Sequence, residues 1–274
     1  MRVLWALVRG PVGVASTAFV AVLAALAMAA PWVSRTDPNQ ITNDVLLAPL
    51  TQAVLGTDEL GRDVLVGLLY GLRVSLLVGL LAAAFATLVG IAIGALAGYF
   101  GGWIDTALMR ITEVFQVMPS FILAAVIVAL LGPGLTRVVM VIAILSWPEA
   151  ARVMRGEVLR VKQLEYVDAV RCLGIGELSV MIREVIPNAL GPVLAVGTLI
   201  IGRAILLEAS LSFFGLSSPD SVSWGRMANS GQQFLFAAWW LSVFPGIAIF
   251  VTVLMFNLFG DTVGRALNPR YARS

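Results

Sequence analysis

The sequence predicts an all-α membrane protein with six transmembrane helices. Of its 274 residues, 59% are hydrophobic and only 12% are charged, and the mean hydropathy is +0.95. These values are too apolar for a soluble domain of this size. Several uncharged runs also reach the roughly 20 residues that a helix needs to cross a ~30 Å hydrocarbon layer with its backbone groups satisfied internally. The single cysteine, Cys172, excludes an intramolecular disulfide, so helix packing must hold the fold.

The first predicted span is the uncharged run Pro11–Val33. This region is also typical of a secretory signal with its cleavage site, because Arg2 and Arg9 precede the run and Ala27-Met28-Ala29 lies near its end. However, the run is longer than the ~7–15 residues of a signal core, and further spans follow it. We therefore interpret it as an uncleaved first helix.

Five further spans follow along the chain. The fourth is the shortest, so Arg137, Glu149 and Arg152 are expected at the two membrane interfaces that flank it. The five spans fall, in chain order, within Val74–Ile104 and Val114–Thr136, at Val138–Pro148, and at about Ala189–Ala209 and Phe234–Phe259.

Small and aromatic residues add two expectations about these spans. Gly90, Gly94 and Gly98 recur at four-residue spacing in the second span, which predicts close packing against another helix. Trp239 and Trp240 near the start of the sixth span suit an aromatic belt at the membrane interface.

The distribution of Lys and Arg predicts that both termini are cytoplasmic. Six spans place the termini on one side, and cytoplasmic loops carry the excess of positive charge. That side collects twelve basic residues: Arg2, Arg9, Arg110, Arg152, Arg155, Arg160, Lys162, Arg171, Arg183, Arg265, Arg270 and Arg273. The other side holds five, namely Arg35, Arg62, Arg73, Arg137 and Arg226, and Arg203 falls inside the fifth span. The chain is thus divided into an N-terminal helix with an extracytoplasmic segment, residues 1–73, and a five-helix core, residues 74–274, with its largest cytoplasmic loop at 150–188.

The cytoplasmic loop is patterned as two short helices separated by Gly174. A glycine there supplies a helix end and a sharp turn. An apolar stripe is expected on each helix, formed by Leu164, Val167, Val170 and Leu173 before the glycine, and by Leu178, Met181, Ile182 and Val185 after it, with the second helix ending at Pro187. An amphipathic loop lying on the bilayer surface accounts equally well for this periodicity.

The same loop resembles the coupling loop of bacterial ABC-importer permeases. The family pattern is Glu-Ala-Ala, three residues, Gly, nine residues and Ile-x-Leu-Pro, and the string from Glu165 to Gly174 followed by 186–188 matches its spacing. Val170, Glu184 and Ile186 depart from it. The resemblance implies the six-helix type I permease fold and docking on ATPase subunits through Glu165, Tyr166, Asp168, Ala169, Arg171, Leu173, Gly174 and Pro187.

Two other segments resemble the dipeptide and oligopeptide branch of that family. They are the strings 55–65 and 208–216, the latter followed by Ser223-Trp224-Gly225. This resemblance implies the second permease of a pair in the bacterial cytoplasmic membrane, with peptide as cargo and nickel or glutathione as alternatives. Its implied partners are membrane lipid, a homologous permease, two ABC ATPases and an extracytoplasmic binding protein. Locally, Thr57 is expected to cap a helix whose first turn carries Asp58 and Glu59.

Catalysis is not expected in this chain. Its one lysine, Lys162, has no phosphate-binding loop around it, so ATP and magnesium are expected on the partner subunits. The absence of histidine removes His-dependent catalytic sites and disfavours a metal site. The dispersed basic residues form no concentrated patch, so no nucleic-acid binding is expected.

Arg203 and Glu208 are the charges expected within the membrane layer. Such residues normally face a protein interior or a water-filled path, so both are candidates for the substrate path. Contacts with a partner subunit are an equal alternative, and pairing with each other is not expected at five-residue spacing. An ion-coupled secondary transporter should show inverted repeats around buried acids, and a channel a filter loop or charged ring; neither pattern is found.

Overall fold

The computed structural model describes residues 11–33, 37–218 and 221–267, and the regular structure of these residues is helical. Arg2, Arg9, Arg35, Arg270 and Arg273, which were used to predict the orientation, lie outside the described residues. The elements are α2 (Pro11–Val33), α3 (Val64–Phe100), α4 (Gly102–Val117), α5 (Ser120–Leu131), α6 (Leu135–Val161), α7 (Glu165–Cys172), α8 (Glu177–Val180), the π-helical turn η1 (Met181–Val185), α9 (Ile186–Phe213), α10 (Trp224–Gln232) and α11 (Trp240–Leu267).

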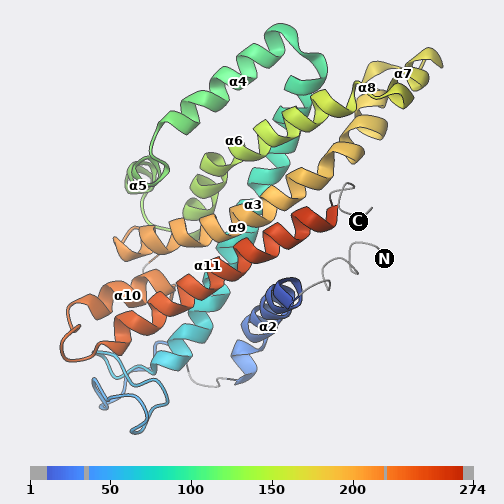
Figure 1. Ribbon diagram of the computed structural model, residues 1–274. Helices are drawn as coiled ribbons and strands as arrows, with labels where there is room; N and C mark the ends of the chain where they lie inside the picture. Colours follow the sequence, from blue (N-terminus) through green and yellow to red (C-terminus); the bar gives the residue numbers. More distant parts are fainter. Residues whose placement is uncertain (1–10, 34–36, 219–220, 268–274) are drawn as a thin grey trace.

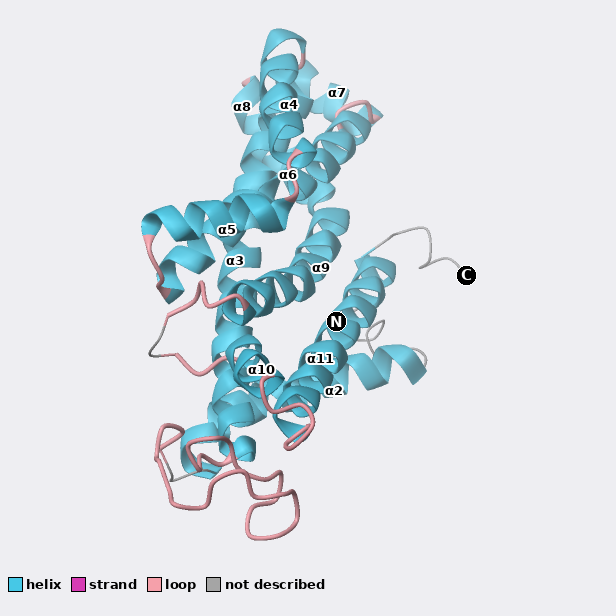
Figure 2. Cartoon of the chain, turned by 90° about the vertical axis from the view of Figure 1, so that its left-hand side faces the viewer, coloured by secondary structure: helices cyan, strands magenta, loops and turns pink. Residues whose placement is uncertain are grey.

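The long helices form one bundle with different structures at its two ends. Helix α3 packs along α6 and α9, and α11 packs along α9 and α2. Helices α7 and α8 project from one end, whereas the loop of residues 37–63 lies at the other, as two perpendicular views show (Figures 1 and 2). The chain therefore presents two well-separated surfaces to potential partners.

Four helical segments in the described part of the chain are long and apolar enough to cross a membrane: α2, α3, the run Glu177–Phe213 and α11. Helices α4 and α5 together make a fifth candidate, bent by 88°. The first span is observed with its predicted bounds. The second begins earlier than predicted, at Val64, and the sixth begins later, at Trp240. The count of six and the orientation stay predictions.

The third span, predicted within Val114–Thr136, is not one continuous helix, because the chain bends between α4 and α5. The chain leaves α4 at Met118, whose ψ of 134° is extended, and α5 begins after Pro119. Proline disfavours helical backbone at the residue before it and lacks an N–H for a continuing helix. Pro119 therefore accounts for the sharp bend between α4 and α5.

The fourth predicted segment, Val138–Pro148, is only part of a longer helix. Helix α6 runs without a break to Val161, so Glu149 and Arg152 lie inside a helix and not at its end. The helix continues because its buried face repeats at three- and four-residue spacing well beyond Pro148, through Ala151, Met154 and Val158.

The close packing predicted for the second span is confirmed by the contact between α3 and α6. A Cβ added to Gly90 would lie 2.5 Å from the Cβ of Ala150, and one added to Gly98 would lie 2.8 Å from the carbonyl oxygen of Arg155. Gly94 likewise faces the backbone of α6 at Ala151. The absence of side chains lets the two backbones approach, and their small residues build the main core.

The loop of residues 37–63 is fastened to the bundle, but not by the predicted cap. Thr57 is not a helix cap: its hydroxyl donates to the Asp44 carbonyl at 2.5 Å. Asp63 caps α3, because its carboxylate accepts from the backbone N–H of Leu65 at 2.7 Å. Trp240 is buried and donates from Nε1 to the Thr57 carbonyl at 3.3 Å, so it is not part of an exposed aromatic belt.

Candidate functional site: a helical elbow and a charged groove

Helices α7 and α8 with the turn η1 form a compact hairpin at one end of the bundle, which we call the elbow (residues 165–185). The prediction of two short helices separated by Gly174 is confirmed. Gly174 has φ +78°, a left-handed conformation that side chains resist. The second helix does not end at Pro187, because η1 joins α8 directly to α9 and Pro187 sits in the first turn of α9. The elbow is thus a continuation of a membrane-spanning helix.

The inner face of the elbow is apolar and packs on α6. Val167, Val180, Met181 and Val185 are buried in one cluster with Met154, Val158 and Val161 of α6. The predicted stripes are only half correct, because Leu164, Leu173, Leu178 and Ile182 are exposed. The elbow therefore has two apolar faces, one packed against the bundle and one uncovered.

A polar network fastens the elbow to the end of α3. The Tyr99 hydroxyl donates to the carboxylate of Glu177. Arg171 lies 3.1 Å from Asp168 and 3.6 Å from Glu177, and its guanidinium stands 5.8 Å from the centre of the Tyr99 ring. Contact with Tyr99 raises the pKa of Arg171 above its usual value. The two arms of the elbow are thus linked to each other and to α3 by one cation.

Tyr166 makes a second link between the arms. Its hydroxyl donates to the Glu184 carbonyl at 3.2 Å. Burial, and next the Glu184 carboxylate, raises the pKa of the Tyr166 phenol, which keeps its proton available for this hydrogen bond. Tyr166 and Arg171 therefore serve the internal structure of the elbow.

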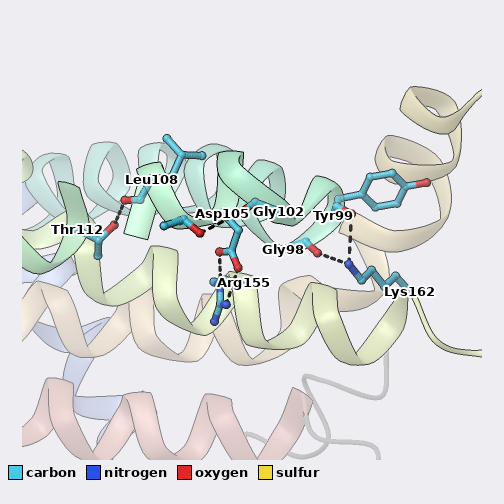
Figure 3. Close-up of polar contacts among 9 residues, drawn as sticks. Gly98, Tyr99, Gly102, Asp105, Leu108, Thr112, Arg155 and Lys162 are labelled. Carbon is cyan, nitrogen blue, oxygen red and sulfur yellow. Dashed lines mark hydrogen bonds and ion pairs between the residues drawn. The ribbon is translucent and has the colours of Figure 1, made fainter. Parts of the chain in front are cut away.

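Next to the elbow, two basic residues hold the junction of α3 and α4: Arg155 of α6 and Lys162, the residue that follows α6 (Figure 3). Lys162 donates from Nζ to the carbonyl oxygens of Gly98 at 2.7 Å and Tyr99 at 3.2 Å. These are acceptors in the last turn of α3, where a cation is favourable. Arg155 forms a two-point ion pair with Asp105 of α4, at 2.5 and 2.6 Å. Sequence reasoning missed these pairs, because the partners lie about fifty or more positions apart and share no local pattern.

The remaining predicted coupling residues face away from the bundle. Glu165, Asp168, Ala169, Leu173, Gly174 and Pro187 are all exposed. Leu173 and Leu178 have exposed fractions of 78% and 59%. The elbow thus presents an apolar tip beside acidic groups at the end of the chain's helical bundle.

A groove of about 580 Å³ opens between the bent pair α4–α5, α6 and α9. Arg203, predicted for the substrate path, lines it and forms an ion pair with Glu149 of α6. Arg152 lines the same groove. The sequence placed Glu149 and Arg152 at membrane interfaces and offered no signal for their contact with Arg203, which depends on how α6 and α9 cross.

Glu208, the other predicted path residue, does not line this groove. It is buried between α3 and α9 with an exposed fraction of 1%. Its carboxylate accepts from the hydroxyls of Ser75 at 3.2 Å and Ser212 at 2.5 Å. As expected, Arg203 and Glu208 do not pair with each other. Glu208 therefore ties two spans together within the core.

Comparison with known proteins identifies the family of the chain. Residues 90–273 match the family described as binding-protein-dependent transport system inner membrane component. The chain is 39% identical to the di/tripeptide transport system permease protein DppC of Pseudomonas aeruginosa over 92% of this chain and 86% of that protein. It is 37% identical to the glutathione transport system permease protein GsiD of Pectobacterium atrosepticum, over 96% and 88% of the two chains.

A third relative and a solved structure agree with this picture. The probable D,D-dipeptide transport system permease protein DdpC of Escherichia coli K12 is 35% identical over 98% of this chain and 91% of its own. The fold is similar to a chain in the inward-facing MetNI methionine ABC transporter, with a TM-score of 0.59, 19% identity, and coverage of 73% and 96%. The predicted all-helical ABC-importer permease fold and the resemblance to the peptide branch are both confirmed.

Proposed function

Because this chain belongs to the family of binding-protein-dependent transport system inner membrane components, we propose that it is the permease subunit of an ABC importer for short peptides. Its relatives over nearly the whole chain are permeases of di/tripeptide and D,D-dipeptide transport. The complete importer contains a second, homologous permease, two ABC ATPases that bind ATP and magnesium, and an extracytoplasmic binding protein. The chain lies in the bacterial cytoplasmic membrane, surrounded by lipid, with the elbow on the cytoplasmic side.

The uncovered apolar face of the elbow is the observation that supports coupling. Leu173, Leu178 and Ile182 are exposed, whereas the opposite face of the same hairpin is packed on α6. A surface of this kind at the end of a bundle is typical of a protein interface. The ATPases dock there, and their closure on ATP moves the elbow as a rigid body.

The elbow is built to transmit such a movement to the spans. It continues through η1 into α9, and it is tied to α3 through Tyr99 and to α6 through its buried valines. A displacement of the elbow therefore moves three helices, two of which border the charged groove. Packed side chains and rigid helices of this kind can transmit a movement at the elbow to the groove.

Substitution of the exposed leucines tests the coupling role. Leu173→Glu combined with Leu178→Glu removes two apolar contacts, each worth about 2 kcal/mol in an interface, so recovery of the ATPases with the tagged permease should fall more than about ten-fold. The matched control is Leu235→Glu, a leucine with an exposed fraction of 47% in the turn between α10 and α11, which lies at the far end of the bundle (Figure 1). It should leave the recovery unchanged.

Normal ATPase recovery with the double variant would refute docking on the elbow. This holds even if uptake is lost, because substitutions that leave recovery normal would then act after the ATPases have assembled with the permease. Uptake of a labelled dipeptide in cells that carry the complete transporter measures the second quantity.

Glutathione is the second candidate cargo, favoured by the 37% identity to a glutathione permease. Competition separates the two. Excess unlabelled glutathione should leave the uptake of a labelled dipeptide unchanged if the importer carries short peptides. Uptake of labelled glutathione without uptake of the dipeptide would instead identify glutathione as the cargo.

A further inference from the structure

We propose that Glu149, Arg152 and Arg203 select cargo by its two charged ends. The Glu149 carboxylate receives the ammonium end of a zwitterionic peptide, and the guanidinium groups of Arg203 and Arg152 receive its carboxylate end. This inference deepens the peptide-import function proposed above and rests on it.

The position of the three charges requires a polar environment in the groove. Arg203 lies well inside α9, within the candidate span Glu177–Phe213, and 62% of its side chain is exposed. A guanidinium facing hydrocarbon is strongly disfavoured, so charged groups within spans face the protein interior or a water-filled path. The groove between α4–α5, α6 and α9 is therefore the wall of an aqueous path.

The Glu149–Arg203 pair is suited to exchange partners. The side chain of Glu149 is 35% exposed and that of Arg203 is 62% exposed. Ion pairs so accessible to water are weak, because solvent competes for both groups. The Asp105–Arg155 pair is the contrasting case, since Asp105 is only 19% exposed and engages Arg155 through both of its oxygens. A charged ligand end can replace one partner of the first pair at little cost.

Arg152 supplies the cation that makes the exchange complete. It lies three positions after Glu149 on α6, which places both on one face of the helix, and it lines the same groove. Among the described residues Arg152 forms no ion pair. When an ammonium group occupies Glu149 and releases Arg203, the groove presents two guanidinium groups to one carboxylate.

The rest of the groove tolerates different peptide side chains. Its volume of about 580 Å³ lies within the roughly 300–1,000 Å³ of small-ligand sites. Apolar side chains make up most of the remaining lining, including Phe115, Phe121 and Leu145. The uncharged polar side chains of the lining are Gln116, Ser120, Ser146 and Ser210. The apolar part contacts any apolar side chain, and the three charged residues are the groups that can distinguish the charged ends of a ligand.

The test uses the complete transporter in liposomes, with the binding protein added on the binding-protein side. Three probes are compared: alanylalanine, its N-acetyl derivative and its C-terminal amide. Each is supplied above the Kd that the binding protein itself shows for it, so that selection by the binding protein does not enter. The measured quantity is peptide transported per ATP hydrolysed.

Glu149→Gln should reduce the wild-type preference for alanylalanine over its N-acetyl derivative by about ten-fold, the effect of losing one charged partner. Its preference over the amide should stay unchanged. Arg152→Gln combined with Arg203→Gln should show the reverse pattern. The matched control is Glu157→Gln, which removes a carboxylate paired with Arg160 at 2.7 Å on the same helix but outside the groove; it should alter neither preference.

Equal slowing of all three probes by Glu149→Gln would overturn the proposal, because the ion pair would then serve only packing or contact with the second permease. Unchanged ratios in both groove variants would overturn it as well. If the wild-type transporter shows no ATP hydrolysis stimulated by the binding protein with any probe, the importer function itself fails, and the groove assignment fails with it.

Discussion

Gly90→Ala is the substitution whose effect follows most directly from the packing of α3 on α6. The new Cβ would lie 2.5 Å from the Cβ of Ala150 and 2.9 Å from the backbone nitrogen of Ala151. Carbon atoms in favourable contact are about 3.5–4.0 Å apart, so α6 must move outward by roughly 1 Å. The obstacle is the Cβ of Ala150 and the helix backbone beside it, and neither can rotate away as the end of a flexible side chain can.

The magnitude follows from two opposing effects. Overpacking of a well-packed core costs about 1–3 kcal/mol, and the gap that opens along the interface also weakens neighbouring contacts. Alanine regains about 1 kcal/mol through its higher helix propensity. Because the clash is with backbone, we expect the upper part of this range, a net loss of about 2 kcal/mol in the free energy of unfolding.

The assay is reversible unfolding of the purified chain in mild detergent by titration with SDS, followed by circular dichroism. Gly156→Ala is the matched control: it lies in α6, and a Cβ added there meets nothing within 4 Å. It should keep or raise the stability by up to about 1 kcal/mol. If Gly90→Ala were as stable as the control, the close approach of the two helices would be wrong.

Three further substitutions probe other parts of the molecule. Asp63→Ala removes the side-chain cap of α3 and should lower the free energy of unfolding by about 1 kcal/mol in the same titration; an unchanged value would show that the cap contributes nothing. Asp105→Asn breaks the ion pair with Arg155 and should make stability less sensitive to salt than in the wild type, since added salt screens the pair; identical salt dependence would contradict this. Gly174→Ala strains a turn with φ +78° and should lower uptake without lowering expression. Gly174→Asn should retain more uptake, because asparagine adopts the left-handed region more readily. Equal uptake by the two variants would show that the turn conformation is unimportant.

Several elements could be predicted because their signal is local. Helix α2 was predicted with its observed bounds from an uncharged run alone. The turn at Gly174 was predicted from one glycine between two periodic segments. The bend between α4 and α5 has a local signal in Pro119, which disfavours helix at the residue before it. The apolar run on both sides of the proline favours one continuous span and obscures that signal.

Helix α6 shows why hydropathy underestimates the length of a helix that carries charges on one face. Its charges made the fourth span look short, yet Glu149 faces a groove and Arg155 is paired with Asp105. The buried face of α6 still repeats regularly to Val161. The apolar residues at these positions, which include Met154, Val158 and Val161, follow the same three- and four-residue spacing in the sequence.

The sequence is enough to predict that this chain is a helical membrane protein, where most of its spans lie and which family its loop motifs resemble. These features depend on runs of apolar residues and on short motifs, which are properties of neighbouring positions. The packing of the helices in space was needed to show that Arg203 pairs with Glu149 and that Glu208 is buried with two serines. It also shows that Lys162 binds the last turn of α3, and that Tyr99 of α3 binds Glu177 of the elbow. Those contacts join residues far apart in the chain, and they arise from the angles and distances at which rigid helices cross.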